Sequence, residues 1–291
     1  MEISSRFVGS HCHPLEIVVT PRMSMNYAAS VDDANPRYFD DERPDGIVAP
    51  PMIANALTWT ISSEIENHWD SEGFPVDAMQ QKVHYLEILE CHRTIIPGEK
   101  IRIEGTLAAM LPHRAGTHMV IRYDGYDSEH KLVFVEYAGA MLRGVECLDG
   151  ARGAENIPAL PERAPKSEAV WERTLYIDPL ACHRFDGCSN VHFPIHSSPA
   201  FAHFVGLPGI LYQGVATLSV AVREITNMEA GGDPDRIRSI RCNFTGMVRP
   251  DSSIKLCALG KSEVDGLTHV HFNVLNQDGQ RAIHKGCVTL S

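Results

Sequence analysis

Residues 206–225 read GLPGILYQGVATLSVAVREI, and this stretch decides how the chain folds. Its glycines and proline form a turn, and the apolar residues that follow recur at helical spacing, as at Leu218, Val222 and Ile225. The segment is apolar over most of its circumference. This is typical of a helix buried by a curved sheet, so the sequence predicts a central helix wrapped by strands.

The chain contains a second stretch of the same kind, GIVAPPMIANALTWTISSEI at residues 46–65. In both halves a turn-rich segment precedes the predicted helix, and strand-forming runs broken by Asp-Gly turns follow it. Matching positions are separated by similar distances: 158 residues for Tyr38 and His196, 163 for Pro51 and Gly214, and 153 for Pro97 and Pro250. This order predicts an internal duplication, and the alternative is a coincidence between two unrelated α+β domains.

We therefore expect an α+β fold of two repeats, each with an antiparallel sheet wrapped around a central helix. Residues 1–148 would form the N-terminal repeat and residues 171–291 the C-terminal repeat. Residues 149–170 are rich in Pro, Gly, Ala and charge, which is typical of a linker. Two such repeats can join edge to edge into one continuous sheet, which protects two strand edges.

Composition narrows the class of function. The net charge of −11 disfavours nucleic acid as a partner, because a phosphate backbone needs a basic footprint. The first residues lack the apolar core of a signal peptide and no run reaches 18 apolar residues, so we expect no membrane partner and a cytoplasmic protein. The eight cysteines, none in a CxxC pair, are then expected to be reduced.

Paired motifs in the two halves carry a resemblance to a known family. The first half contains DANPRY (33–38) and VAPPM (48–52), and the second contains FPIH (193–196), GLPG (206–209) and QG (213–214). Over about residues 20–291 the chain resembles the MaoC-like, (R)-specific enoyl-CoA hydratase family in its double-hotdog form. The resemblance implies a hydratase or dehydratase that acts on an acyl thioester of coenzyme A or an acyl-carrier protein, without a cofactor or metal.

The resemblance also implies roles for individual residues. The backbone amide of Gly214, at the start of the central helix, would hold the thioester oxygen as an enolate forms, because a helix N-terminus leaves amides unpaired. A His/Asp pair would handle the water and the α-proton, and His196 is the histidine of that pair. The N-terminal repeat, in contrast, resembles the non-catalytic type of repeat in this family.

The sequence departs from the family pattern at the Asp of the His/Asp pair. Aligned at the 158-residue offset, Val191 and Phe193 stand opposite Asp33 and Asn35, while Tyr38 stands opposite His196. The resemblance therefore leaves Asn190 or His192 to replace the missing Asp. The substrate-binding residues that it implies are Val191, Phe193, Gln213, Asp33 and Tyr38.

Each assignment has a structural alternative. His196 could be a structural histidine, Asn190 could form an Asx turn, Asp33 and Asn35 could cap a turn, and Tyr38 could pack. The histidines His183, His192 and His196 could also hold a metal, although no carboxylate or cysteine shows matching ligand spacing.

Two other functions stay open. The scaffold could hydrolyse the thioester, which would need a carboxylate or activated water near the helix start, or the chain could be a silent acyl-binding subunit, which the incomplete His/Asp pair favours. A double hotdog satisfies its own pseudo-dimer interface, so a homodimer of such units is a further expectation.

Overall fold

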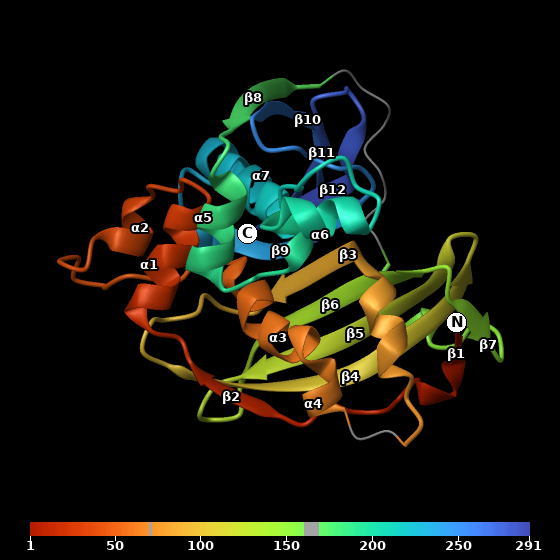
Figure 1. The fold of residues 1–291 in the computed structure, drawn as a ribbon. Helices are drawn as coiled ribbons and strands as arrows, with labels where there is room; N and C mark the ends of the chain where they lie inside the picture. The colour runs from red at the N-terminus through yellow and green to blue at the C-terminus, as the bar shows by residue number, and fades with distance from the viewer. Residues whose placement is uncertain (70–71, 160–168) are drawn as a thin grey trace.

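The computed structural model describes residues 1–69, 72–159 and 169–291. Within them the main sheet has ten strands in the order β2-β4-β5-β6-β3-β9-β12-β11-β10-β8, and β1 pairs with β7 in a small parallel sheet (Figure 1). The strands of the first half are β1 (Glu2–Ser4), β2 (Leu15–Val18), β3 (Lys82–Cys91), β4 (Lys100–His113), β5 (Gly116–Tyr126), β6 (Leu132–Arg143) and β7 (Glu146–Leu148). Those of the second half are β8 (Trp171–Ile177), β9 (Ile237–Phe244), β10 (Ser252–Val264), β11 (Leu267–Leu275) and β12 (Arg281–Leu290).

The sheet is symmetric about its middle. Reading outward from the centre, β3-β6-β5-β4-β2 on one side match β9-β12-β11-β10-β8 on the other. The central pair is antiparallel and runs in register from Leu86 opposite Asn243 to Glu90 opposite Ser239. Two repeats therefore share one sheet, and neither β3 nor β9 is left as an open edge.

One long helix covers the inner face of each half. These helices are α3 (Ile53–Ser63) and α7 (Gly214–Glu229), whose side chains at Leu57 and Leu218 are fully buried. The predicted segment 206–225 begins with a turn and becomes helical only at Gly214. The other helices are α1 (Pro21–Ser30), α2 (Pro36–Phe39), α4 (Ile65–His68), α5 (Ala181–Ser189) and α6 (Pro199–Phe204). Short 3-10 segments span Ser5–Phe7, Val76–Gln81, Ala154–Asn156, Pro194–His196 and Pro234–Arg236.

The opening helices of the two repeats also meet. Figure 1 shows α1 beside α5, and Tyr27 contacts Phe185 edge to face with 5.8 Å between ring centroids. The Tyr27 hydroxyl reaches Ser219 of α7 at 2.9 Å. The first repeat therefore packs on the central helix of the second, and a single core cluster runs through both halves.

Residues 149–159 of the expected linker run along the first repeat, where Arg152 bridges to Met110 and Asn156 bonds the Ala108 carbonyl. Residues 160–168 lie outside the described residues. No helix in the described part of the chain is long and apolar enough to cross a membrane. All eight cysteines are free thiols.

Candidate active site

A cavity of about 600 Å³ lies where the two repeats meet. Its wall comes from α7 and the loop before it, from α3, and from β3, β5 and β6 of the first repeat. His196 and Gly214 both line it, together with four other predicted site residues: Val191, His192, Phe193 and Gln213. The volume is within the range of cavities that hold small ligands.

His196 is held in a defined orientation. Pro194 begins the short 3-10 segment after the extended Phe193, and Nδ1 of His196 lies 2.7 Å from the carbonyl oxygen of Leu211. A carbonyl only accepts hydrogen bonds, so Nδ1 carries the proton and Nε2 keeps its lone pair. Burial lowers the pKa of His196, so the neutral imidazole is the form present at pH 7. A neutral, fixed histidine can act as a general base.

The start of α7 has unused amide donors. No side chain caps it, and among the described residues the amides of Gly214, Val215 and Ala216 have no acceptor. The start of α3 differs, because Ile53, Ala54 and Asn55 donate to the carbonyls of residues 50–52. Of these two central helices, α7 is thus the one whose start offers free donors to a ligand oxygen.

Phe244 packs closely against Gly214, where a larger residue would have a side chain. A Cβ built there would lie 3.1 Å from Cδ1 and 3.3 Å from Cε1 of Phe244. The Phe244 ring therefore packs against the Cα of Gly214, and an added side chain would have to displace it. Gln213 precedes Gly214 and donates through Nε2 to the Cys182 carbonyl at 3.0 Å, which ties the helix start to α5.

Asn190 does not reach the cavity. It ends α5 in the left-handed conformation, with φ of 61°, and its amide donates to the Asp186 carbonyl. Asparagine tolerates this conformation at a helix end, which is the physical reason for its position. His192 lines the cavity but is exposed, and its Nδ1 lies 3.3 Å from the Asn190 carbonyl. The described residues contain no group of His, Cys, Asp and Glu that could hold a metal.

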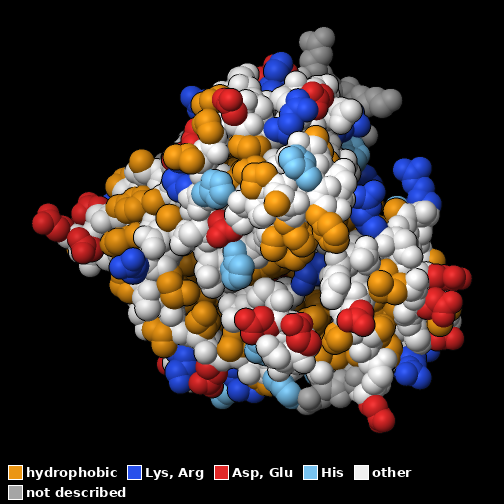
Figure 2. All heavy atoms as spheres, in the orientation of Figure 1, with side chains coloured by type: hydrophobic (Ala, Val, Ile, Leu, Met, Phe, Trp, Pro, Cys, Tyr) orange, Lys and Arg blue, Asp and Glu red, His pale blue; other side chains and the backbone are white. Residues whose placement is uncertain are grey.

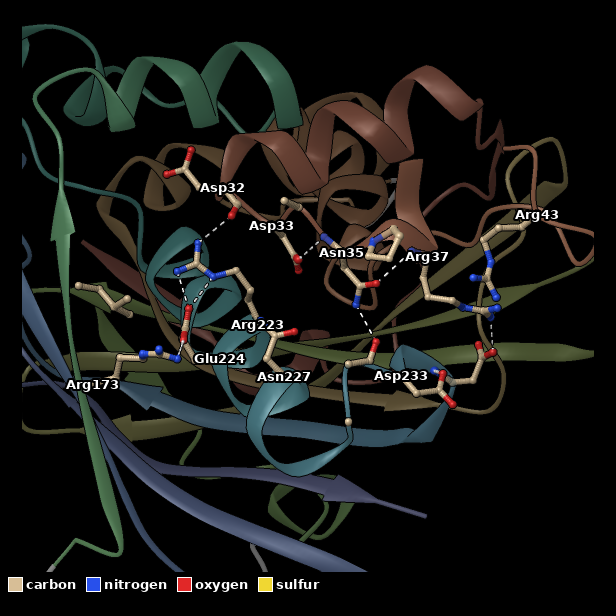
Figure 3. A pocket seen from close by; sticks show the side chains of 16 residues that line it. Asp32, Asp33, Asn35, Arg37, Arg43, Arg173, Arg223, Glu224, Asn227 and Asp233 are labelled. Atoms are coloured by element: carbon tan, nitrogen blue, oxygen red, sulfur yellow. Dashed lines mark hydrogen bonds and ion pairs between the residues drawn. The ribbon is translucent and has the colours of Figure 1, made fainter. Parts of the chain in front are cut away.

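Asp33 lies in a separate groove of about 1010 Å³ (Figure 3), lined by α2, the end of α7 and part of β8. Its carboxylate accepts from the Asn35 amide, and burial raises the pKa of Asp33. Asn35 caps α2 and donates to the Gly232 carbonyl at 2.7 Å. The two residues shape a turn and link the repeats, so the structure does not support substrate binding by Asp33 at the cavity.

The arginines of this groove are all paired with acceptors. Arg223 bonds Glu224 and the backbone of residues 31–32, and Arg173 bonds Glu224 (Figure 3). Tyr38 is 2% exposed and packs with Ala28 and Val48. It fills space rather than lining the cavity, so it does not bind a ligand there.

The structure also places polar residues at the cavity that the sequence prediction missed. Asn55 and His84 line it, and Glu87 and Glu136 lie behind them, fully buried. Glu136 is in phase with Phe134 and Ala138 on β6, so strand alternation could have marked it as inward-facing. Its meeting with α3 could not be read from the sequence.

Exposed hydrophobic side chains lie on and just after α6. Figure 2 shows them gathered over α6, where Phe204 is 85% and Val205 47% exposed. Leu207, two residues further on, lines the cavity.

Comparison with known proteins agrees with this architecture. Residues 160–277 match the family described as MaoC like domain, and residues 6–131 match the FAS1-like dehydratase domain region. The solved structure of a MaoC-like dehydratase from Phytophthora capsici superposes with a TM-score of 0.80 at 18% identity, covering 97% of this chain and 96% of that one. At this identity the match establishes the fold.

Two curated relatives cover parts of the chain. The fatty acid synthase beta subunit pkiC of Emericella nidulans is 37% identical over 73 residues, 25% of this chain and 4% of that protein. A probable enoyl-CoA hydratase 2 of Dictyostelium discoideum is 25% identical over 161 residues, 55% of this chain and 52% of that protein. The chain spans about half of the second relative and a small part of the first. The chain therefore has a double-hotdog fold, its C-terminal half matches the MaoC like domain, and its N-terminal half matches the FAS1-like dehydratase domain region.

Proposed function

We propose that this chain adds water to, or removes it from, the α,β-bond of an acyl thioester, with coenzyme A as the carrier. The observation that carries the proposal is the cavity lined by both His196 and the uncapped start of α7. A fixed neutral imidazole and free amide donors are what this reaction needs at its two ends. The name of the Dictyostelium relative, enoyl-CoA hydratase 2, supports the same reaction.

In the hydration direction, Nε2 of His196 takes a proton from water as the water oxygen bonds to the β-carbon. The electron pair of the double bond moves toward the thioester oxygen, which the amide of Gly214 holds as an enolate. The enolate then takes a proton at the α-carbon from the imidazolium, so His196 returns to its neutral form. Removal of one preorganised oxyanion donor commonly costs about 3 kcal/mol in the barrier.

The two repeats would have different roles. The C-terminal repeat, residues 171–291, would carry His196 and Gly214, while the N-terminal repeat, residues 1–148, would form the acyl wall. That wall includes Trp59, Met79 and Met119 in the same cavity. An apolar wall of this kind fits the hydrocarbon of an acyl chain.

The test is to incubate the protein with crotonyl-CoA and with longer or branched enoyl-CoAs. Loss of the enoyl absorbance and release of free thiol are followed together. We expect loss of absorbance without thiol. Thiol release would instead indicate a thioesterase, and binding with neither signal would indicate a silent subunit; either result overturns the proposal.

Substitution of the histidine connects activity to the cavity. His196→Ala should abolish hydration, whereas His203→Ala, an exposed histidine on α6 that does not line the cavity, should keep it. Full activity in His196→Ala would contradict the assignment of the base.

Three further properties belong to this proposal. We propose a homodimer of double-hotdog units, which sedimentation would test, and coenzyme A over an acyl-carrier protein, which competition between the two thioesters would test. We also propose the cytoplasm as the compartment, which microscopy of a tagged chain would test. One relative is named peroxisomal multifunctional enzyme type 2, from Drosophila melanogaster, so peroxisomal signal would count against this compartment.

A further inference from the structure

Hydration of a double bond needs the attacking water to be held by more than one group. Water has two O–H bonds, and a single acceptor leaves it free to rotate about that hydrogen bond. The loop that carries His196 offers no second acid or base inside the cavity. Val191 and Phe193 are apolar, and His192 is exposed and lies against the Asn190 carbonyl. The second group therefore has to come from elsewhere in the wall.

His84, on β3 of the first repeat, lies in that wall. Its side chain is 30% exposed, and it lines the same cavity as His196 and Gly214. Its ring lies 4.5 Å, centroid to centroid, from the ring of Phe244, the side chain nearest to the position that a Cβ on Gly214 would take. Phe244 thus connects His84 to the start of α7.

The hydrogen bonds of His84 fix its tautomer. Its Nε2 lies 3.1 Å from the Leu86 carbonyl oxygen and 3.1 Å from Oε2 of Glu87. The carbonyl can only accept, so Nε2 carries the proton and Nδ1 keeps its lone pair. Burial lowers the pKa of His84 to about 4, which keeps the ring neutral at pH 7.

Glu87 is itself held by a buried network. Nδ2 of Asn55 donates to Glu136 at 2.8 Å and to Glu87 at 3.4 Å, so one amide joins the two buried carboxyls. Burial raises the pKa of Glu87 to about 8 and that of Glu136 well above its usual range. Burying polar groups of this kind costs free energy unless they are hydrogen-bonded to one another.

We propose that His84 is a second catalytic residue, supplied by the N-terminal repeat, and that Glu87 is its positioning residue. This inference rests on the proposed hydration reaction. Nδ1 of His84 accepts one O–H of the attacking water while Nε2 of His196 accepts the other, which aims the water lone pair at the β-carbon. His196 takes the proton and returns it to the α-carbon; His84 keeps its own proton on Nε2, so no net proton is gained or lost.

The arrangement would account for the missing acid of the C-terminal loop. One repeat contributes the base and the oxyanion donor, and the other contributes the second contact to the water. Neither repeat would then be catalytic alone. This goes beyond an N-terminal repeat that only forms the acyl wall.

The test compares His84→Gln with His118→Gln in the full chain, using crotonyl-CoA hydration. His118 is a matched control, because it is also partly buried in the first repeat's sheet and its pKa is also lowered to about 4 by desolvation, but it does not line the cavity. We expect His84→Gln to lose about 100-fold in kcat with KM changed less than threefold, as for loss of one acid/base contact. His118→Gln should keep activity within threefold.

A second readout separates chemistry from structure. His84→Ala removes the imidazole, and added imidazole should raise the kcat of this variant at least tenfold. A purely structural role for His84 would instead lower the unfolding midpoint and give no rescue. Glu87→Gln should lower kcat while leaving KM within threefold.

The outcomes distinguish the two proposals. If the wild-type chain hydrates enoyl-CoA and His84→Gln keeps more than a third of kcat, His84 is not catalytic and the hydration function stands. If the wild-type chain hydrates no enoyl-CoA, the proposed function fails and the role of His84 fails with it. Loss of kcat in His84→Gln with rescue in His84→Ala supports the inference.

Discussion

Replacing Gly214 by Ala is the substitution for which the structure gives the clearest expected result. The added methyl would lie 3.1 Å from Cδ1 of Phe244, closer than ordinary van der Waals contact, so the ring must move by a few tenths of an ångström. The methyl would also stand beside the amide that is proposed to hold the thioester oxygen. The substitution therefore obstructs the oxygen without removing a side chain.

The substitution should affect catalytic activity and folding stability to different extents. Loss of one oxyanion donor costs about 3 kcal/mol, which corresponds to roughly a 100-fold lower kcat/KM. Folding should change little. Alanine in a helix is favoured over glycine by about 0.5–1 kcal/mol, and this gain offsets the contact with Phe244.

The assay is steady-state hydration of crotonyl-CoA by Gly214→Ala, with urea unfolding of the same preparation. Gly187→Ala is the matched control: Gly187 lies in helix α5, and a Cβ there would meet nothing within 4 Å. The control should gain about 0.5–1 kcal/mol of stability and keep full activity.

One result would refute the reasoning. If Gly214→Ala folds as the wild type does and keeps kcat/KM within threefold, the thioester oxygen does not bind at the start of α7. A loss of activity that is matched by a large loss of stability would point instead to misfolding around Phe244.

Three other predictions follow from the same structure. Burial raises the pKa of Glu87 in the folded chain to about 8, so its neutral form contributes stability in full below pH 4.5. This stability is lost as pH rises toward 8, by up to about 1.4 kcal/mol per pH unit, and the free energy of unfolding in urea should depend less on pH in Glu87→Gln. Asn35→Ala should lower the free energy of unfolding by about 1–2 kcal/mol, because it removes the cap of α2 and the hydrogen bond to the Gly232 carbonyl. Its kcat should be unchanged, and a loss of kcat would instead connect the groove of Figure 3 to the reaction. Met119→Trp should fill part of the acyl wall, so kcat/KM for long enoyl-CoAs should fall at least tenfold more than for crotonyl-CoA, and equal losses would place the acyl chain elsewhere.

The architecture could be predicted because its signals are local and repeated. Apolar spacing marked α3 and α7, and the same order of helix and strands in both halves indicated the duplication. The shared sheet then follows from pairing β3 with β9. The start of α7 at Gly214 also agrees with the prediction, because the glycines and proline of residues 206–209 indicated a turn before the helix.

Only the part of the site that is formed by the segment from His196 to Gly214 could be predicted from the sequence. His196 and Gly214 lie in one cavity because they are close in the chain and joined through Leu211. Asn190 was expected to replace the missing Asp, but it ends α5 instead. An asparagine after a helix often ends it in the left-handed conformation. Tyr38 aligned with His196 in the duplication but became a core residue.

His84, Asn55 and the two glutamates were missed because their meeting is not encoded locally. Strand alternation shows that Glu87 and Glu136 face inward, but not that α3 places Asn55 between them. It also cannot show that β3 lies beside β9 and thus brings His84 to Phe244.

The most direct measurement is a crystal structure of the chain with a bound 3-hydroxyacyl-CoA. Our account predicts the thioester oxygen at about 3 Å from the Gly214 amide nitrogen and the β-hydroxyl between the rings of His196 and His84. An acyl group bound outside this cavity, or a thioester oxygen turned away from the start of α7, would contradict it.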